Sequence, residues 1–298
     1  MKMPILFALL LSLLSTAQAA ETHSLEGAFG PIQVQPAPQR VVTLDEGALD
    51  TALALGVQPV GTVSTRGSDG ISDYLKDAAG TPAIVGTTRA PNLEAILRLK
   101  PDLIIAPAGL DPTLYAVYSR LAPTAVVKPS SSADWQATVR FYAQALGREF
   151  QGRETLAAID QRTDAIKAGL KGSPSVSVVR WNPQGPVAMG SQVFVGQLLT
   201  AAGLRSTELA SSLNRPHSDV LSLENLSKID ADWMFVTSLN ADGAKTLAEA
   251  RKQPAFERLG AVQKQRAVTV DGQVWSSGSG PLAASRVLDD LQQALSAQ

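Results

Sequence analysis

The chain has 298 residues, of which 45% are hydrophobic, 18% charged and 5% aromatic, as in an ordinary globular protein. Lysine and arginine total 26 against 27 aspartates and glutamates, which leaves no basic excess for binding nucleic acid. The lack of cysteine excludes disulfides and thiolate metal sites, and the two histidines, His23 and His217, are too few for a histidine-built zinc site.

Residues 1–19 are typical of an export signal peptide. Lys2 supplies the positive start, residues 5–14 form an almost unbroken apolar run, and Ala17-Gln18-Ala19 has small residues at the positions that signal peptidase reads. The apolar run is too short to anchor the chain in a bilayer, and no cysteine follows it that could carry a lipid. We therefore expect cleavage after Ala19 and a soluble protein in a bacterial periplasm.

After this segment, short apolar runs rich in β-branched residues alternate with helical patterns. We expect strands at Val41–Leu44, Pro59–Val63, Leu103–Ala106, Thr124–Val127, Val176–Trp181, Trp233–Thr237 and Ala267–Val270. We expect helices between or after them at Gly47–Leu55, Leu93–Leu99, Trp135–Leu146 and Pro281–Leu295. Such alternation predicts an α/β protein with mainly parallel sheets covered by helices, and continuous apolar runs suit strands that are buried on both faces.

The stretch Glu149–Lys171 differs from its surroundings, because it is highly charged and its apolar residues recur every three to four positions. This pattern predicts one long helix with a single apolar stripe, roughly 30 Å long at 1.5 Å per residue. It could be a surface helix within one domain. We favour a linking helix between an N-terminal lobe, residues 20–148, and a C-terminal lobe, residues 172–298.

An internal repeat supports two similar lobes. Residues 92–105 and 222–235 align without a gap, and both begin with a good N-cap, place a glutamate in the first helical turn and bring an aspartate directly before an apolar strand. A second pair, residues 53–57 and 199–204, has an apolar helix that ends at a glycine. The repeat is much longer than that of a solenoid.

No catalytic constellation is visible in the sequence. There is no Walker loop, no Rossmann glycine pattern and no serine elbow followed by a suitable histidine. Ligands of open α/β sheets bind beyond the carboxyl ends of strands, and arginine binds carboxylates while tryptophan offers a rigid face. We therefore predict no catalytic residue and no metal site. The candidate ligand-binding residues are Arg66, Arg89, Arg180, Trp181, Arg215 and Trp275.

Two segments carry a resemblance to a known family: residues 85–96, Val-Gly-Thr-Thr-Arg-Ala-Pro-Asn-Leu-Glu-Ala-Ile, and residues 99–105, Leu-Lys-Pro-Asp-Leu-Ile-Ile. The chain resembles the periplasmic iron–siderophore-binding proteins of ABC importers, of the ferric-citrate and ferric-hydroxamate type. The resemblance implies two α/β lobes joined by one long helix, and a monomer that binds a ferric siderophore between them. It also implies that Glu94 and Glu224 dock on an inner-membrane permease.

The resemblance implies no cofactor, since iron would arrive only as a siderophore chelate. An aromatic residue that the hydroxamate binder uses has no match, because Leu110 stands there, which favours a carboxylate or mixed-ligand siderophore. Two alternatives stay open. One is a haem or cobalamin binder of the same fold, and the other is a periplasmic enzyme on a two-lobed α/β scaffold.

Overall fold

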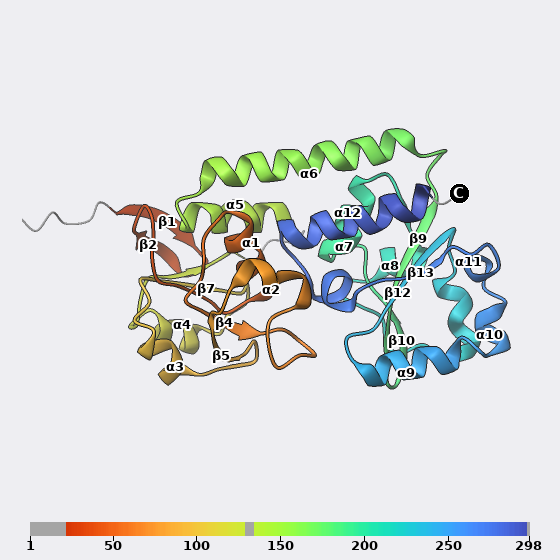
Figure 1. Ribbon diagram of the computed structural model, residues 1–298, viewed down its shortest axis with the longest axis horizontal. Helices are drawn as coiled ribbons and strands as arrows, with labels where there is room; N and C mark the ends of the chain where they lie inside the picture. Colours follow the sequence, from red (N-terminus) through yellow and green to blue (C-terminus); the bar gives the residue numbers. More distant parts are fainter. Residues whose placement is uncertain (1–21, 129–133, 297–298) are drawn as a thin grey trace, which may run out of the picture.

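In the computed structural model the described residues are 22–128 and 134–296. The predicted signal peptide, residues 1–19, lies outside them. The described chain forms two halves side by side, with one long helix across the top of both (Figure 1). We refer to the halves as the N-terminal lobe and the C-terminal lobe.

The N-terminal lobe is a six-stranded sheet in the order β6-β5-β4-β3-β7-β8, preceded by a two-stranded hairpin of β1 and β2. All neighbouring strands of the larger sheet run parallel except β5 and β6. The strands are β1 (His23–Gly27), β2 (Gly30–Val34), β3 (Val41–Thr43), β4 (Gly61–Ser64), β5 (Ala83–Thr87), β6 (Ala90–Pro91), β7 (Leu103–Ala106) and β8 (Thr124–Val126). The helices are α1 (Glu46–Ala54), α2 (Asp73–Ala79), α3 (Leu93–Arg98), α4 (Pro112–Tyr118) and α5 (Trp135–Ala145).

The C-terminal lobe is a five-stranded sheet in the order β10-β9-β12-β13, with β11 also paired to β9. Only β10 runs antiparallel to its neighbour. The strands are β9 (Ser175–Asn182), β10 (Gly185–Ala188), β11 (Arg205–Ser206), β12 (Trp233–Thr237) and β13 (Ala267–Thr269). The helices are α7 (Phe194–Ala201), α8 (Glu208–Ser212), the 3₁₀-helix η1 (Leu223–Ile229), α9 (Ala241–Ala250), α10 (Pro254–Glu257), α11 (Gly260–Gln263), the short π-helix η2 (Gln273–Ser277) and α12 (Pro281–Ser296).

The predicted α/β class is confirmed, and every predicted strand and helix is present with small shifts at its ends. The apolar runs are central strands: β7 and β12 are buried along their whole length, as expected for parallel strands covered on both faces. The hairpin of β1 and β2 was not predicted, because its strands are short and alternate between exposed and buried residues.

The internal repeat places the same contact in both lobes. In the N-terminal lobe the backbone N–H groups of Gln39 and Arg40 donate to the Asp102 carboxylate at 2.7 and 2.8 Å. In the C-terminal lobe the backbone N–H of Ser175 donates to Asp232 at 2.8 Å. Each aspartate precedes a central strand and holds the start of the neighbouring parallel strand. The repeat is inexact in its helix, since the first copy is the α-helix α3 and the second is the 3₁₀-helix η1.

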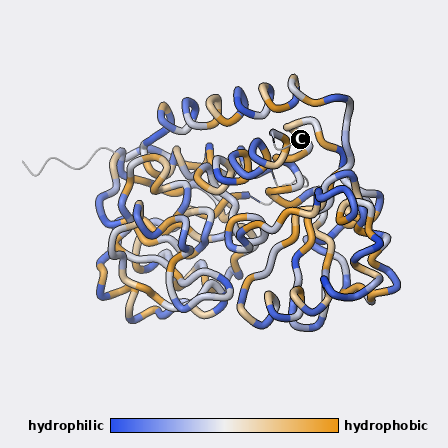
Figure 2. Tube along the Cα trace, turned by 45° about the vertical axis from the view of Figure 1, so that its right-hand side comes forward, coloured by the Kyte–Doolittle hydropathy of each residue, from blue (hydrophilic) through white to orange (hydrophobic). Residues whose placement is uncertain are grey.

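Helix α6 (Glu149–Gly169) spans 21 residues and packs on α5 of the N-terminal lobe and on α7 and α12 of the C-terminal lobe (Figure 1). Its buried stripe includes Leu156, Ile159 and Ile166, which join the core of the C-terminal lobe. Figure 2 shows hydrophilic and hydrophobic residues alternating along α6. This placement supports the proposed role of α6 as a link between the lobes.

Candidate functional site

Three arginines from the two lobes line one groove of about 520 Å³. Arg66 follows β4 and Arg89 lies between β5 and β6, so both come from the N-terminal lobe. Arg180 lies near the end of β9 in the C-terminal lobe. The volume is in the range of pockets for small ligands. The groove therefore collects three of the predicted ligand contacts at the carboxyl ends of parallel strands.

Arg66 is held by the first residue of α1. That helix begins after the N-cap Asp45, whose side chain accepts the Gly47 N–H at 3.0 Å. The Glu46 carboxylate, 7% exposed, then accepts the backbone N–H of Arg66 at 2.5 Å and its guanidinium at 3.4 Å. Burial raises the pKa of Glu46, and the contacts with Arg66 oppose that rise. Arg66 is thus oriented by a buried carboxylate while its own side chain stays 54% exposed.

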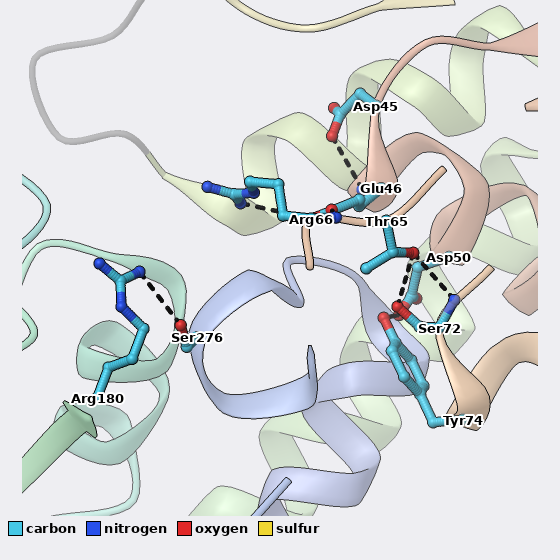
Figure 3. A network of polar contacts seen from close by, with 10 residues as sticks. Asp45, Glu46, Asp50, Thr65, Arg66, Ser72, Tyr74, Arg180 and Ser276 are labelled. Carbon is cyan, nitrogen blue, oxygen red and sulfur yellow. Dashed lines mark hydrogen bonds and ion pairs between the residues drawn. The ribbon is translucent and has the colours of Figure 1, made fainter. Parts of the chain in front are cut away.

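Arg180 has no such partner. Its Nη1 donates to the Ser276 hydroxyl at 3.4 Å (Figure 3), and its buried Nε has no hydrogen-bond partner. Burial lowers the pKa of Arg180, and the positive charge of Arg66 lowers it further. Arg89 is exposed. No aspartate or glutamate is among the described residues that line the groove. The groove is therefore positively charged and suited to an anion.

The rest of the wall is mixed. It combines apolar side chains with small polar groups. The apolar residues are Met189, Val193, Phe194, Val195 and Leu239, and the polar ones include Asn182, His217 and the segment 276–279. The Nδ1 atom of His217 lies 2.8 Å from the carbonyl oxygen of Ser218. A carbonyl only accepts, so Nδ1 carries a proton and Nε2 is the ring nitrogen left for other contacts.

Comparison with known proteins identifies the family. The family model for periplasmic binding proteins matches residues 41–274. The chain belongs to the periplasmic binding protein family. This confirms the resemblance drawn from residues 85–105, and it identifies the chain as a binding protein rather than an enzyme.

Relatives of this binding protein cover nearly its whole length. It is 32% identical over 290 residues to a probable siderophore-binding lipoprotein of Bacillus subtilis, covering 93% of this chain and 89% of the relative. It is 30% identical over 265 residues to the achromobactin-binding periplasmic protein of Dickeya dadantii, covering 85% of each. The crystal structure of a Staphylococcus aureus protein complexed with staphyloferrin B superposes with a TM-score of 0.82 at 28% identity, covering 92% of this chain and 99% of the other.

Within the binding protein, Trp181 does not reach the groove. Its side chain is 2% exposed and packs edge-on against Phe256 at a centroid distance of 5.9 Å. Successive side chains of a strand point to opposite faces, so Arg180 and Asn182 face the groove while Trp181 enters the core. The prediction of a ligand contact at Trp181 is corrected accordingly. The same alternation would have singled out Asn182 from the sequence.

Trp275 lines the groove but offers no free ring face. It is 1% exposed, its indole N–H donates to Asp290 at 2.7 Å, and its ring stacks on Phe235 at 4.4 Å. The expectation that it stacks on a ligand is therefore corrected, because its indole N–H and one ring face are in use and the rest of the ring is buried. Arg215 is also occupied, since two of its nitrogens donate to Asp219 at 2.9 and 2.6 Å. It is not among the groove-lining residues, although the next two residues are.

Glu94 and Glu224 are both exposed near the start of their helices, and neither is among the residues that line the groove. Glu94, whose side chain is 86% exposed, lies 4.0 Å from Arg98. The segment that leads into Glu224 is bonded to β10 through Leu221. Helix α3 and strand β10 both lie on the side opposite α6 (Figure 1).

Within residues 22–128 and 134–296, no three or more histidines, aspartates or glutamates are grouped so that they could hold a metal ion. In the same ranges, no helix has the length and apolar character needed to cross a membrane.

Proposed function

We propose that this protein binds an anionic ferric siderophore, of carboxylate or mixed-ligand type, in the groove between its lobes. We further propose that it acts as a periplasmic monomer that delivers the chelate to an inner-membrane ABC permease. A siderophore supplies the ligands of the iron itself, so the protein has only to match the charge and shape of the chelate.

One observation carries the choice of ligand. Arg66, Arg89 and Arg180 line the same groove from both lobes, and the buried Nε of Arg180 has no partner. A carboxylate bound there would pair with the guanidinium of Arg180 and would offset the repulsion between Arg66 and Arg180. The apolar residues that line the groove would cover the organic part of the ligand.

The names of the relatives support the same ligand class. Besides the achromobactin-binding protein, the Fe(3+) dicitrate-binding periplasmic protein of Escherichia coli is 26% identical over 290 residues, covering 96% of this chain and 93% of the relative. Both of these relatives are described as periplasmic proteins, which also supports the proposed location.

The ligand proposal is tested by titration. The mature protein should bind ferric citrate in calorimetry, with a change in tryptophan fluorescence, and Arg180→Ala should weaken binding about 10- to 100-fold, equivalent to about 1.5–3 kcal/mol for a lost charge-assisted hydrogen bond. Arg140→Ala is the matched control, because Arg140 of α5 is paired with Asp134, the N-cap residue of that helix, and is not among the groove-lining residues.

The expected order of ligands is ferric carboxylate chelates first and neutral ferric hydroxamates last. Binding of haem or cobalamin, with no binding of any ferric chelate, would overturn the proposal. An Arg180→Ala protein that binds ferric citrate as well as the parent would remove Arg180 from the site.

The permease proposal rests on Glu94 and Glu224, one exposed glutamate from each copy of the repeat. The double variant Glu94→Ala/Glu224→Ala should keep the parent's melting temperature, because exposed ion pairs such as Glu94–Arg98 contribute little to stability. It should also keep ligand affinity, while uptake of ferric chelate by cells falls strongly.

A matched control removes two acids from the opposite side of the molecule. The double variant Glu154→Ala/Asp164→Ala lies on exposed positions of α6 and should leave uptake unchanged. Uptake at the parental rate by the Glu94/Glu224 variant, at equal protein level, would rule out these residues as permease contacts.

A further inference from the structure

The first turn of α12 is capped by a residue of the other lobe. The backbone N–H groups of Leu282 and Ala283, at the start of α12, donate to the two oxygens of the Asp50 carboxylate at 2.8 and 2.9 Å. Asp50 belongs to α1 of the N-terminal lobe and is 0% exposed. The first N–H groups of a helix have no partner within the helix, so Asp50 satisfies two of them across the lobe boundary.

A third donor comes from α2. The Tyr74 hydroxyl donates to the same carboxylate at 2.9 Å (Figure 3). Donors from α2 and α12 therefore meet at Asp50, which itself lies on α1. A carboxylate without proton only accepts, so one buried side chain holds three separate helices together.

Two glycines make this approach possible. A Cβ atom on Gly280 would overlap the carboxylate of Asp50, and a Cβ atom on Gly47 would overlap the Ser279 hydroxyl. Neither glycine has a positive φ, so the requirement is space and not an unusual backbone conformation. The chain just before α12 is thus packed directly on α1.

That same chain forms part of the groove. Residues 276–279, which end two positions before α12 begins, line it, and the Ser276 hydroxyl accepts the hydrogen bond from Arg180. A shift of this segment would move the groove wall and the contact that orients Arg180. We propose that Asp50 is a positioning residue for ligand binding, which holds the segment 276–280 of the C-terminal lobe against the N-terminal lobe without touching the ligand.

This inference rests on the proposed function for its binding readout, and a second readout does not depend on any ligand. Asp230 is the matched control. Its carboxylate accepts the backbone N–H groups of Gly260 and Ala261, at the start of α11, at 2.7 and 3.1 Å. It makes the same kind of cap, but both partners lie within the C-terminal lobe and none of them lines the groove.

The test compares Asp50→Asn, Gly280→Ala and Asp230→Asn, each at a temperature well below its melting point. Loss of a helix cap typically changes the equilibrium between the ordered and the unfolded helix about tenfold. We expect Asp50→Asn and Gly280→Ala each to weaken ferric citrate binding by about that factor, and Asp230→Asn to leave it at the parental value. Hydrogen exchange of the ligand-free protein should be faster across residues 276–283 in the first two variants only.

Tyr74→Phe provides a milder variant that keeps both backbone hydrogen bonds to Asp50. Its affinity for ferric citrate and its hydrogen-exchange rate across residues 276–283 should lie between those of the parent and of Asp50→Asn. Equal affinity and equal exchange in Asp50→Asn and the parent would overturn the proposal, as would an equal loss in Asp230→Asn. If the parent protein fails to bind ferric citrate, the proposed ligand class fails, and the exchange of residues 276–283 still decides whether Asp50 holds the segment.

Discussion

The carboxylate of Asp50 links the charge state of a single residue to folding. Burial raises its pKa from 3.8 to about 6, the hydrogen bonds from Leu282, Ala283 and Tyr74 oppose that rise, and the nearby Asp45 adds to it. Because the folded protein holds this proton more tightly than the unfolded chain does, the group adds stability as the pH falls from about 7 towards 4. Burial raises the pKa of Asp45 and Glu46 as well, so they contribute with the same sign.

We predict that the free energy of unfolding gains about 1 kcal/mol from Asp50 between pH 7.5 and pH 5, from the value of one pKa unit. Asp50→Asn cannot ionise and should lose that part of the gain, while the parts due to Asp45 and Glu46 remain. Urea unfolding of the parent and the variant at both pH values measures the difference. Identical pH dependence in the two proteins would contradict the raised pKa.

At the residue scale, three of the four arginines predicted from the sequence line the groove and Arg215 does not, while the residues around them were not predicted. Arg66 and Arg180 were found because each lies near the end of an expected strand, and Arg89 because it precedes the helix expected at Leu93–Leu99. Trp275 was misjudged because the need of its indole N–H for a partner is met by Asp290, 15 positions further on in α12. The role of Asp50 was invisible, since its partners Leu282 and Ala283 are 232 and 233 residues away.

At the scale of elements, the contact between α5 and α6 depends on a small residue. A Cβ atom on Gly152 of α6 would come within 2.7 Å of the Ala143 Cβ of α5. Glycine lowers helix stability by about 1 kcal/mol relative to alanine, so its presence in mid-helix is explained by this close approach. The close approach of α6 to α5 is therefore set by two small residues, Gly152 and Ala143.

We predict that Gly152→Ala lowers the free energy of unfolding by about 1–3 kcal/mol, as overpacking does, despite the better helix propensity of alanine. Adding Ala143→Gly should restore most of the loss, because it frees the same space. Gly169→Ala, in the last turn of the same helix with nothing within 4 Å of its Cβ, should be neutral or stabilising. Denaturant titration of the variants separates steric from propensity effects, and a stabilised Gly152→Ala protein would disprove the steric account.

The strands were predictable for a physical reason that does not extend to every element. Central parallel strands such as β7 and β12 are buried on both faces and so consist of continuous apolar residues. Strand β9 combines such a run with an alternating end, and the alternation of Arg180, Trp181 and Asn182 was not used. The 3₁₀ form of η1 was also missed, and the side chain of the expected N-cap Ser222 makes no capping hydrogen bond to the helix backbone, whereas Asn92 caps α3.

For the whole molecule, the lobes are joined by more than α6. Asp50 bonds to α12, the Gln273 side chain accepts the backbone N–H of Asp73 at 3.1 Å, and Trp135 of α5 packs edge-on against Phe194 of α7. Helix α6 contains no proline that could serve as a kink. These contacts resist a large rotation of one lobe against the other.

We predict that the radius of gyration changes by less than about 1 Å on binding ferric citrate, against roughly 19 Å for a compact chain of this length. Solution X-ray scattering with and without the chelate measures this directly. A fall of several ångströms would show that the lobes rotate as they do around a flexible hinge, and that the contacts between α1 and α12 break.

The surplus of arginine over acid along the groove has a practical consequence for any solution that contains this protein. A positively charged surface attracts any anion. Phosphate, sulfate and free citrate should therefore all compete for Arg66, Arg89 and Arg180. The apparent affinity for ferric citrate should therefore be weaker in phosphate buffer than in an amine buffer without phosphate. For the proposed ligand class, iron-free carboxylates would also compete, so occupancy of the groove would follow the ratio of iron-loaded to iron-free carboxylate and not the amount of iron alone.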